Sequence, residues 1–155
     1  MLSIGSKAPD FKLKLEGRKH FHLRSFHGKA NVVISFFPTG LSMHEIDETH
    51  GFLQYLESVQ SLGVIVVIIT SKNVSELKKS LHKYKIKIPV AYDTTLEVCR
   101  NYHAFWLRGL GLRKVTYVVD KKGIVRGHLH HHLLTEKTWN KILHLVQDLE
   151  VEKSA

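Results

Sequence analysis

The sequence predicts an α/β protein, with a central mixed β-sheet flanked by helices and an N-terminal β-hairpin. Two short apolar runs, Val32–Phe37 and Val64–Ile69, are rich in β-branched residues and have the composition of buried strands. Between these runs the apolar spacing becomes helical, which is typical of a βαβ unit with parallel strands. Near the C-terminus, two strand-like stretches flank Lys121-Lys122-Gly123, which predicts an antiparallel hairpin.

The first elements follow from side-chain alternation and from chain breakers. Residues 11–26 alternate between apolar and polar side chains across Gly17, so we expect a hairpin there. Asn31–Phe37 is expected to be a buried strand that ends at Pro38. From Ser42 the apolar residues recur at helical spacing until Gly63, which predicts a long helix.

The alternation of strand and helix continues to the C-terminus. Gly63–Thr70 is the most apolar stretch and is predicted to lie at the centre of the sheet. Asn73 and Glu76 have the spacing of a capping box for the next helix. The remaining predicted elements are a strand over Ile88–Tyr92, a helix over Thr95–Tyr102, strands over Val115–Asp120 and Ile124–His130, and a terminal helix with Trp139, Ile142, Leu143, Val146 and Leu149 on its apolar face. This order is that of a thioredoxin-like fold with an N-terminal extension, and we expect one domain over residues 1–155.

Composition restricts the class of protein. The chain has 155 residues, of which 43% are hydrophobic and 24% charged, which is typical of a globular domain. No apolar run is long enough to cross a bilayer, and the N-terminus lacks an apolar export core, so we expect a cytoplasmic protein. The single cysteine, Cys99, excludes an intrachain disulfide and a C-x-x-C redox pair.

The chain is strongly basic, with a formal net charge of +9 and a pI of about 9.7. Its lysines are spread over many elements and are densest between residues 78 and 87. A solvated basic surface is the interpretation that this spread favours, and an anionic partner is the alternative. No nucleic-acid-binding motif accompanies the lysines, so neither a nucleic acid nor a membrane is expected as a partner.

Three stretches of the chain carry a resemblance to a known family. They are Ile4-Gly5 with Ala8-Pro9-Asp10-Phe11, Val32-Val33 through Phe36-Phe37-Pro38, and Lys114 through Val125. These stretches resemble the peroxiredoxins, most closely their bacterioferritin-comigratory, alkyl hydroperoxide reductase-like branch. The likeness extends from about Ile4 to Leu149, so it implies a thiol-peroxidase scaffold over nearly the whole chain.

The resemblance breaks at the family's active-site motif, P-x-x-x-[T/S]-x-x-C. Pro38 and Ser42 match the motif, but Glu45 stands where the family has its peroxidatic cysteine, and Lys114 aligns with its active-site arginine. A resolving cysteine of this branch would fall at His50. Peroxide reduction needs a thiolate, and a carboxylate has no comparable reaction with peroxide. Glu45 can keep the negative charge, either paired with Lys114 or exposed to solvent, and both arrangements remain open.

Two other groups of residues are candidates for chemistry. Cys99 is either a relocated reactive thiol or a buried core residue. His128, His130 and His132 would share one face of a strand, where they either hold a metal ion such as zinc, copper or nickel or are simply exposed. No cofactor is expected.

The sequence therefore predicts a peroxiredoxin-like protein that has lost peroxide reduction and acts as a binding or regulatory pseudo-enzyme. The alternatives are an active thiol-dependent peroxidase that uses Cys99 and a histidine-based metal-binding protein. A thiol-redox protein or a peroxide-like small molecule is the expected partner, and a homodimer is a further expectation.

Overall fold

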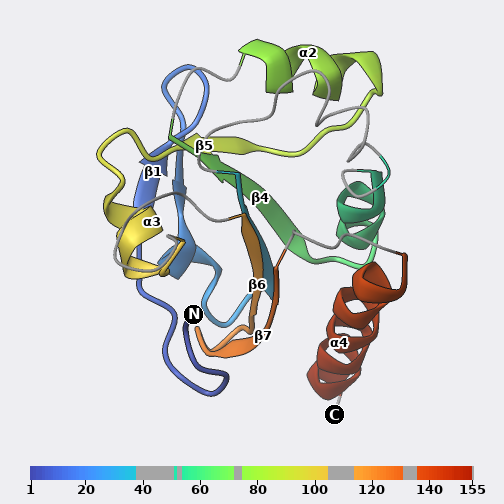
Figure 1. Cartoon of the computed structure of the whole chain (residues 1–155). Helices are drawn as coiled ribbons and strands as arrows, with labels where there is room; N and C mark the ends of the chain where they lie inside the picture. Colours follow the sequence, from blue (N-terminus) through green and yellow to red (C-terminus); the bar gives the residue numbers. More distant parts are fainter. Residues whose placement is uncertain (38–50, 52–53, 72–74, 105–113, 131–135, 155) are drawn as a thin grey trace.

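A seven-stranded mixed sheet organises the chain in the computed structural model, which describes residues 1–37, 51, 54–71, 75–104, 114–130 and 136–154 (Figure 1). The spatial order is β2-β1-β5-β4-β3-β6-β7. The strands are β1 (Lys12–Lys14), β2 (His20–His22), β3 (Val32–Phe36), β4 (Ile65–Thr70), β5 (Val90–Tyr92), β6 (Val115–Val119) and β7 (Val125–His130). Strands β3, β4 and β5 are parallel and the other pairings are antiparallel, which confirms the predicted mixed sheet.

Helices cover both faces of this sheet. They are α2 (Ser75–Lys83), α3 (Glu97–Asn101) and α4 (Glu136–Ser154), with a 3₁₀ helix η1 over Leu23–Phe26. Residues 54–60 are also helical and belong to the long helix predicted from Ser42, whose first part lies outside the described residues. Figure 1 shows α4 and the helical segment 54–60 on one side of the sheet and α3 on the other. Within the described residues, no helix is long and apolar enough to cross a membrane.

Several predicted elements are shorter in the structure than the sequence suggested. The second strand of the N-terminal hairpin ends at His22, and η1 replaces its predicted continuation. Strand β5 begins at Val90 rather than Ile88, after Pro89, which has no amide to donate. Helix α3 spans only five residues, because Leu96 takes a left-handed conformation with φ of 63° just before it. The capping residue proposed at Asn73 lies outside the described part of the chain.

Alternation along the strands produces two separate cores. Val33, Val66, Ile68 and Val118 point to the side of α4, α2 and segment 54–60. The other core lies under α3 and the N-terminal segment, and its strand residues include Val32, Ile34, Phe36, Val67, Ile69, Val115, Tyr117 and Val119. Burial of these aliphatic side chains from both faces explains why β3 and β4 read as nearly continuous apolar runs in the sequence.

The late hairpin is fixed against the N-terminal segment at Gly123. This glycine has φ of +79°, and a Cβ built on it would lie 2.6 Å from the Nε2 atom of His27. The amide of Gly28 donates to the carbonyl of Lys121 over 2.8 Å beside this contact. The positive φ therefore favours glycine at this turn, and any larger residue would also require the His27 ring to shift.

Candidate functional site

The predicted active-site segment follows directly from the end of strand β3. Pro38, Ser42 and Glu45 lie outside the described residues, as do His44 and His50. The residue before this segment is well fixed, because the amide of Phe37 donates to the carbonyl of Ile69 over 2.8 Å and its side chain is fully buried. Phe37 therefore lies at the C-terminal end of β3, between β4 and β6.

Lys114 lies at the same edge as the start of this segment. Strands β3 and β6 are antiparallel, with Phe36 opposite Val115. Lys114 comes one residue before Val115 and is therefore next to Phe37, the last described residue before Pro38. Its side chain is half-buried. The fold thus places Lys114 beside Phe37, the last described residue before the predicted active-site segment.

A pair of buried hydroxyl groups lies two residues further into the sheet from Phe37 and Lys114. Ser35 and Thr116 face each other across β3 and β6, and their hydroxyl oxygens are 2.7 Å apart. Both residues are fully buried. By strand alternation both point to the same face as Val33 and Val118. This hydrogen bond joins the two strands that carry Phe37 and Lys114 to the candidate site.

A third buried hydroxyl was missed by the sequence analysis. Thr70 is the last residue of β4, and because β3 and β4 are parallel with Phe36 beside Ile69, it lies next to Phe37. Its side chain is fully buried, and its Oγ1 atom has no hydrogen-bond partner within the described residues. An unsatisfied buried hydroxyl costs about 1–3 kcal/mol. The only sequence signal was a threonine that ends an otherwise aliphatic strand.

The single thiol of the protein lies in the second core, away from these residues. Cys99 is 0% exposed and packs in the core under α3. Burial raises the pKa of the Cys99 thiol, and a hydrogen bond to Asp93 and the negative charge of this residue raise it further, whereas Arg100 acts weakly in the opposite direction. This environment disfavours the thiolate that a peroxidatic cysteine requires.

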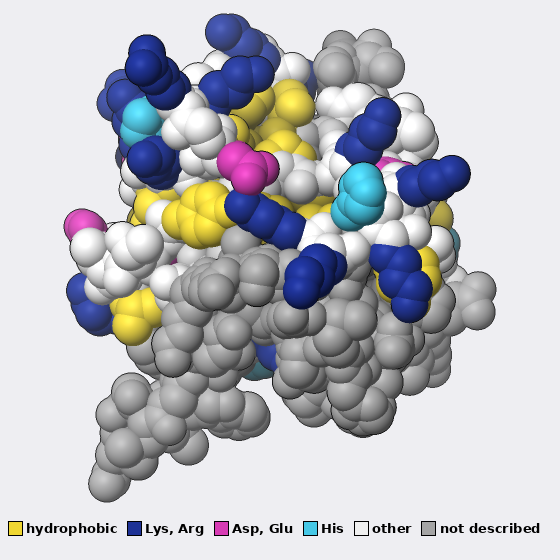
Figure 2. All heavy atoms as spheres, turned by 90° about the horizontal axis from the view of Figure 1, so that it is seen from above, with side chains coloured by type: hydrophobic (Ala, Val, Ile, Leu, Met, Phe, Trp, Pro, Cys, Tyr) yellow, Lys and Arg dark blue, Asp and Glu magenta, His cyan; other side chains and the backbone are white. Residues whose placement is uncertain are grey.

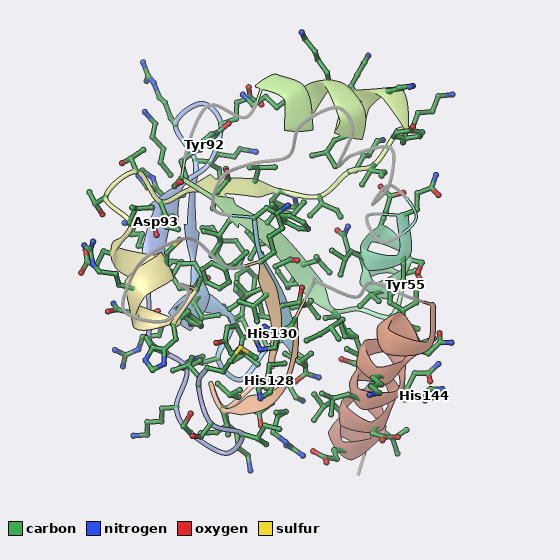
Figure 3. All side chains as sticks on the ribbon, viewed as in Figure 1. Tyr55, Tyr92, Asp93, His128, His130 and His144 are labelled. Carbon is green, nitrogen blue, oxygen red and sulfur yellow. The ribbon has the colours of Figure 1, made fainter. Side chains whose placement is uncertain are left out.

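Asp93 is the residue that positions Cys99, and the sequence analysis did not single it out. One carboxylate oxygen accepts the amide of Cys99 over 2.7 Å and the other accepts the amide of Val98 over 3.3 Å. Asp93 is 1% exposed and follows strand β5 directly, where Figure 3 labels it beside Tyr92. An acidic residue four positions before Glu97, at the start of a predicted helix, was the available signal for this capping role.

The histidine run is only partly described. His128 and His130 are alternate residues of β7 and therefore face the same side of it (Figure 3), whereas His132 lies outside the described residues. His128 is opposite Tyr117, with ring centroids 6.3 Å apart in an edge-to-face arrangement. Among the residues that the structure describes, no group of three or more His, Cys, Asp or Glu side chains could hold a metal ion.

Comparison with known proteins agrees with this scaffold. The model of the AhpC/TSA family matches residues 4–128, and the chain belongs to that family. It is 28% identical over 149 residues to chloroplastic peroxiredoxin Q from Triticum aestivum, covering 96% of this chain and 68% of the relative. It is 26% identical over 129 residues to alkyl hydroperoxide reductase E from Mycobacterium bovis, covering 81% and 84% respectively.

A solved structure confirms the fold. The crystal structure of peroxidoxin BcpB from Mycobacterium tuberculosis superimposes with a TM-score of 0.77 at 17% sequence identity. The superposition covers 96% of this chain and 99% of that protein. The predicted resemblance to the bacterioferritin-comigratory branch of the peroxiredoxins and the predicted thioredoxin-like fold are therefore both confirmed.

Proposed function

We propose that this chain is a single-domain peroxiredoxin-family protein, over residues 1–155, that does not reduce peroxides and acts by binding. The observation that carries the proposal is the state of its one cysteine. Cys99 is the only cysteine of the chain, and it is fully buried in an apolar core with its thiolate disfavoured. Peroxide reduction by this family of scaffolds needs an accessible thiolate, and the chain offers none.

Glu45 occupies the position of the missing thiolate in this proposal. Reduction of a hydroperoxide consumes two thiols and yields an alcohol, water and a disulfide, and a carboxylate supplies none of these electrons. A carboxylate in the first turn of a helix retains a stabilising interaction of about 0.3–1 kcal/mol with the helix dipole. Lys114 is the candidate counter-charge, because its strand brings it next to Phe37. The degenerate site formed by Pro38, Ser42, Glu45 and Lys114 is thus proposed to bind a peroxide-like small molecule or to form part of the surface that contacts a partner protein.

Partner and location remain part of the proposal. A cytoplasmic thiol-redox protein and a second copy of this chain are the partners that the family resemblance favours. His128 and His130 are proposed to be the end of a strand that holds no metal ion, since among the described residues they belong to no group of three or more His, Cys, Asp or Glu side chains. Metal analysis of the purified protein tests this last point.

The deciding experiment is peroxide consumption by the purified protein in the presence of a thiol reductant. Hydrogen peroxide and an organic hydroperoxide are both offered to the wild type and to Cys99→Ser, with the metal content of each sample recorded. No consumption by either protein supports the proposal. Consumption that disappears in Cys99→Ser would show that Cys99 is the catalytic thiol, and consumption that follows bound metal would show a metal-dependent activity.

A restored variant makes the negative result informative. Glu45→Cys returns the sulfur to the family position, with Glu45→Ser as the matched control for the loss of the carboxylate. Peroxide consumption by Glu45→Cys alone would support position 45 as the point at which activity was lost. Activity in wild type equal to that of Glu45→Cys would contradict the proposal.

A further inference from the structure

An apolar groove lies between the N-terminal hairpin, α2 and strand β5. It has a volume of about 500 Å³, and its apolar lining includes Leu15, Leu81, Ile86, Ile88, Val90 and Tyr92. Figure 2 views the molecule from above and shows hydrophobic side chains on this face with lysine and arginine side chains around them. A groove of this size accommodates a few apolar side chains of a ligand.

The rim of the groove is basic on both sides. Exposed cations come from the hairpin on one side and from α2 and the residues after it on the other. They are Lys14, Arg18 and Lys19 on the hairpin, and Lys79, Lys83, Lys85 and Lys87 on the other side, whereas Lys78 is the lysine that belongs to the described lining itself. These two sets of cations are far apart in the sequence and are brought to the same face by the fold. The sequence alone therefore showed them as separate groups of lysines. Converging cations favour an anionic ligand.

One ion pair spans the groove between its two walls. The Nζ atom of Lys78 on α2 lies 2.7 Å from a carboxylate oxygen of Glu16 on the hairpin, and 5.7 Å from the centroid of the Tyr92 ring. The two side chains are 42% and 78% exposed, so the pair is weak and open to exchange. A carboxylate of a ligand can therefore replace Glu16 as the partner of Lys78.

The sheet leaves a strand edge beside the groove. Strand β1 pairs with β5 at one position only, Lys14 with Tyr92. Beyond this position the chain of the hairpin turns back, since the amide of Leu15 donates to the carbonyl of Lys19 over 2.9 Å. The pairing thus stops before Val90, which lines the groove. An extended peptide can add to a strand edge of this kind and place alternate side chains in the adjoining groove.

We infer that this groove is a docking site for an extended acidic peptide segment of a partner protein. Apolar side chains of the segment enter the groove, and its carboxylates pair with the basic rim. A nucleic acid would use the cations but leave the apolar lining without a function. A membrane surface fits poorly, because the large hydrophobic residues that protrude most among the described ones, Ile4, Leu62 and Val151, do not line this groove.

This inference deepens the proposed binding function by assigning it a surface and a class of partner. Of the residues singled out for chemistry, the described ones, Lys114 and Cys99, do not line the groove. Peroxide consumption and peptide binding can therefore be measured separately, and failure of one leaves the other intact.

The test is a selection from a display library of random ten-residue peptides on the full-length protein. We expect enriched sequences to combine Asp or Glu with Leu, Ile or Phe at alternate positions. The best peptide is then measured by fluorescence anisotropy against the double variant Lys19→Glu/Lys83→Glu, which reverses one charge on each side of the groove. Binding should weaken by about tenfold or more, because charges across an interface couple at this level. The control Lys122→Glu/Lys141→Glu makes the same charge change elsewhere and should alter binding by no more than about twofold.

A second variant tests the apolar contact. Leu15→Ser removes one half-buried wall of the groove and should also weaken peptide binding, with thermal unfolding checked to confirm that the variant is folded. The inference is overturned if no acidic and apolar pattern is enriched, or if the enriched peptides bind the rim variant as well as the wild type. Tight binding of a 20-nucleotide single-stranded DNA or of anionic vesicles without peptide enrichment would also overturn it, in favour of those ligands. A dimer that dissociates in Leu15→Ser would assign the groove to a second copy of the chain.

Discussion

The backbone amide of Cys99 donates to a carboxylate oxygen of Asp93 over 2.7 Å, so the carboxylate that caps the first turn of α3 from four positions before it also lies beside the only thiol of the protein. The carboxylate satisfies two amides at the helix start, and its negative charge acts against ionisation of the thiol. Helix capping and suppression of thiol reactivity are therefore performed by the same side chain.

The state of this thiol leads to the first prediction. The native protein should react with a maleimide or with 5,5′-dithiobis(2-nitrobenzoic acid) far more slowly than the same protein in denaturant, because Cys99 is buried and its pKa is raised. Asp93→Asn should lower the pKa of Cys99 and, by losing one cap acceptor, reduce the free energy of unfolding by about 0.5–2 kcal/mol. Labelling kinetics against pH and urea unfolding measure the two effects. Fast labelling of the native wild type at neutral pH would contradict the burial of the thiol.

The buried hydroxyls beside the candidate site give the second prediction. Ser35→Ala removes the 2.7 Å hydrogen bond between Ser35 and Thr116 and should cost about 0.5–1.5 kcal/mol of unfolding free energy. Adding Thr116→Val should cost less than a second independent loss, which a double-mutant cycle in urea detects. Thr70→Val is the contrast, since its hydroxyl has no partner within the described residues and its replacement should be close to neutral or stabilising. A large loss in Thr70→Val would contradict the prediction that this hydroxyl contributes no stabilising hydrogen bond.

Acid sensitivity at the N-terminal hairpin gives the third prediction. Partial burial pushes the pKa of Asp10 upward, but hydrogen bonds from His22 and from the amide of Arg24 outweigh this and hold the pKa below its ordinary value of 3.8. A lowered pKa in the folded state means that the stabilisation is complete above the unfolded-state pKa and is lost as the pH falls through the folded-state pKa.

The size of this effect should be small. The side chains of His22 and Asp10 are 41% and 46% exposed, so solvent screening limits the contribution to less than about 1 kcal/mol. Unfolding at pH 7, 5 and 3 should show a smaller acid-induced loss for Asp10→Asn than for the wild type. Asp148→Asn, at an exposed carboxylate on α4, is the control, and an identical loss in all three proteins would argue against the assignment.

The turn at Gly123 gives the fourth prediction. Gly123→Ala should destabilise the protein by more than about 1–2 kcal/mol, because it combines a left-handed conformation with a Cβ placed 2.6 Å from His27. Gly17→Ala has a similar φ of +76° but meets nothing within 4 Å, so it isolates the conformational cost. Thermal unfolding of both variants compares them, and equal losses would mean that the imidazole of His27 moves aside at little cost.

Long buried strands could be predicted from the sequence more reliably than the short elements. The positions of β3, β4 and β6 were predictable because burial on both faces leaves β-branched apolar runs, whereas β7 was predictable from the Lys121-Lys122-Gly123 turn before it. The bounds of the short elements β5 and α3 were harder to predict. Pro89 precedes β5 and the left-handed Leu96 precedes α3, and neither changes the apolar pattern around these elements.

The candidate site was less accessible to sequence reasoning than the scaffold. Strand register, which places Lys114 next to Phe37 and Thr70 beside it, is a non-local property that no spacing in the sequence encodes. The same holds for the basic rim, whose two halves are brought together by the single pairing of Lys14 with Tyr92. By contrast, the apolar neighbours of Cys99 at helical spacing did indicate that this thiol belongs to a core.

The enclosed position of Cys99 has a consequence for how partners can be found. Thiol–disulfide exchange requires a thiolate that can reach another sulfur, and the only sulfhydryl of this chain lies inside its second core. A mixed disulfide at Cys99 is therefore closed to the folded protein, and a complex of the kind proposed above would form and dissociate noncovalently. Under the proposed binding function, the occupancy of such a complex would follow the concentrations of its two components, and no disulfide of this chain would add to it during a burst of oxidant.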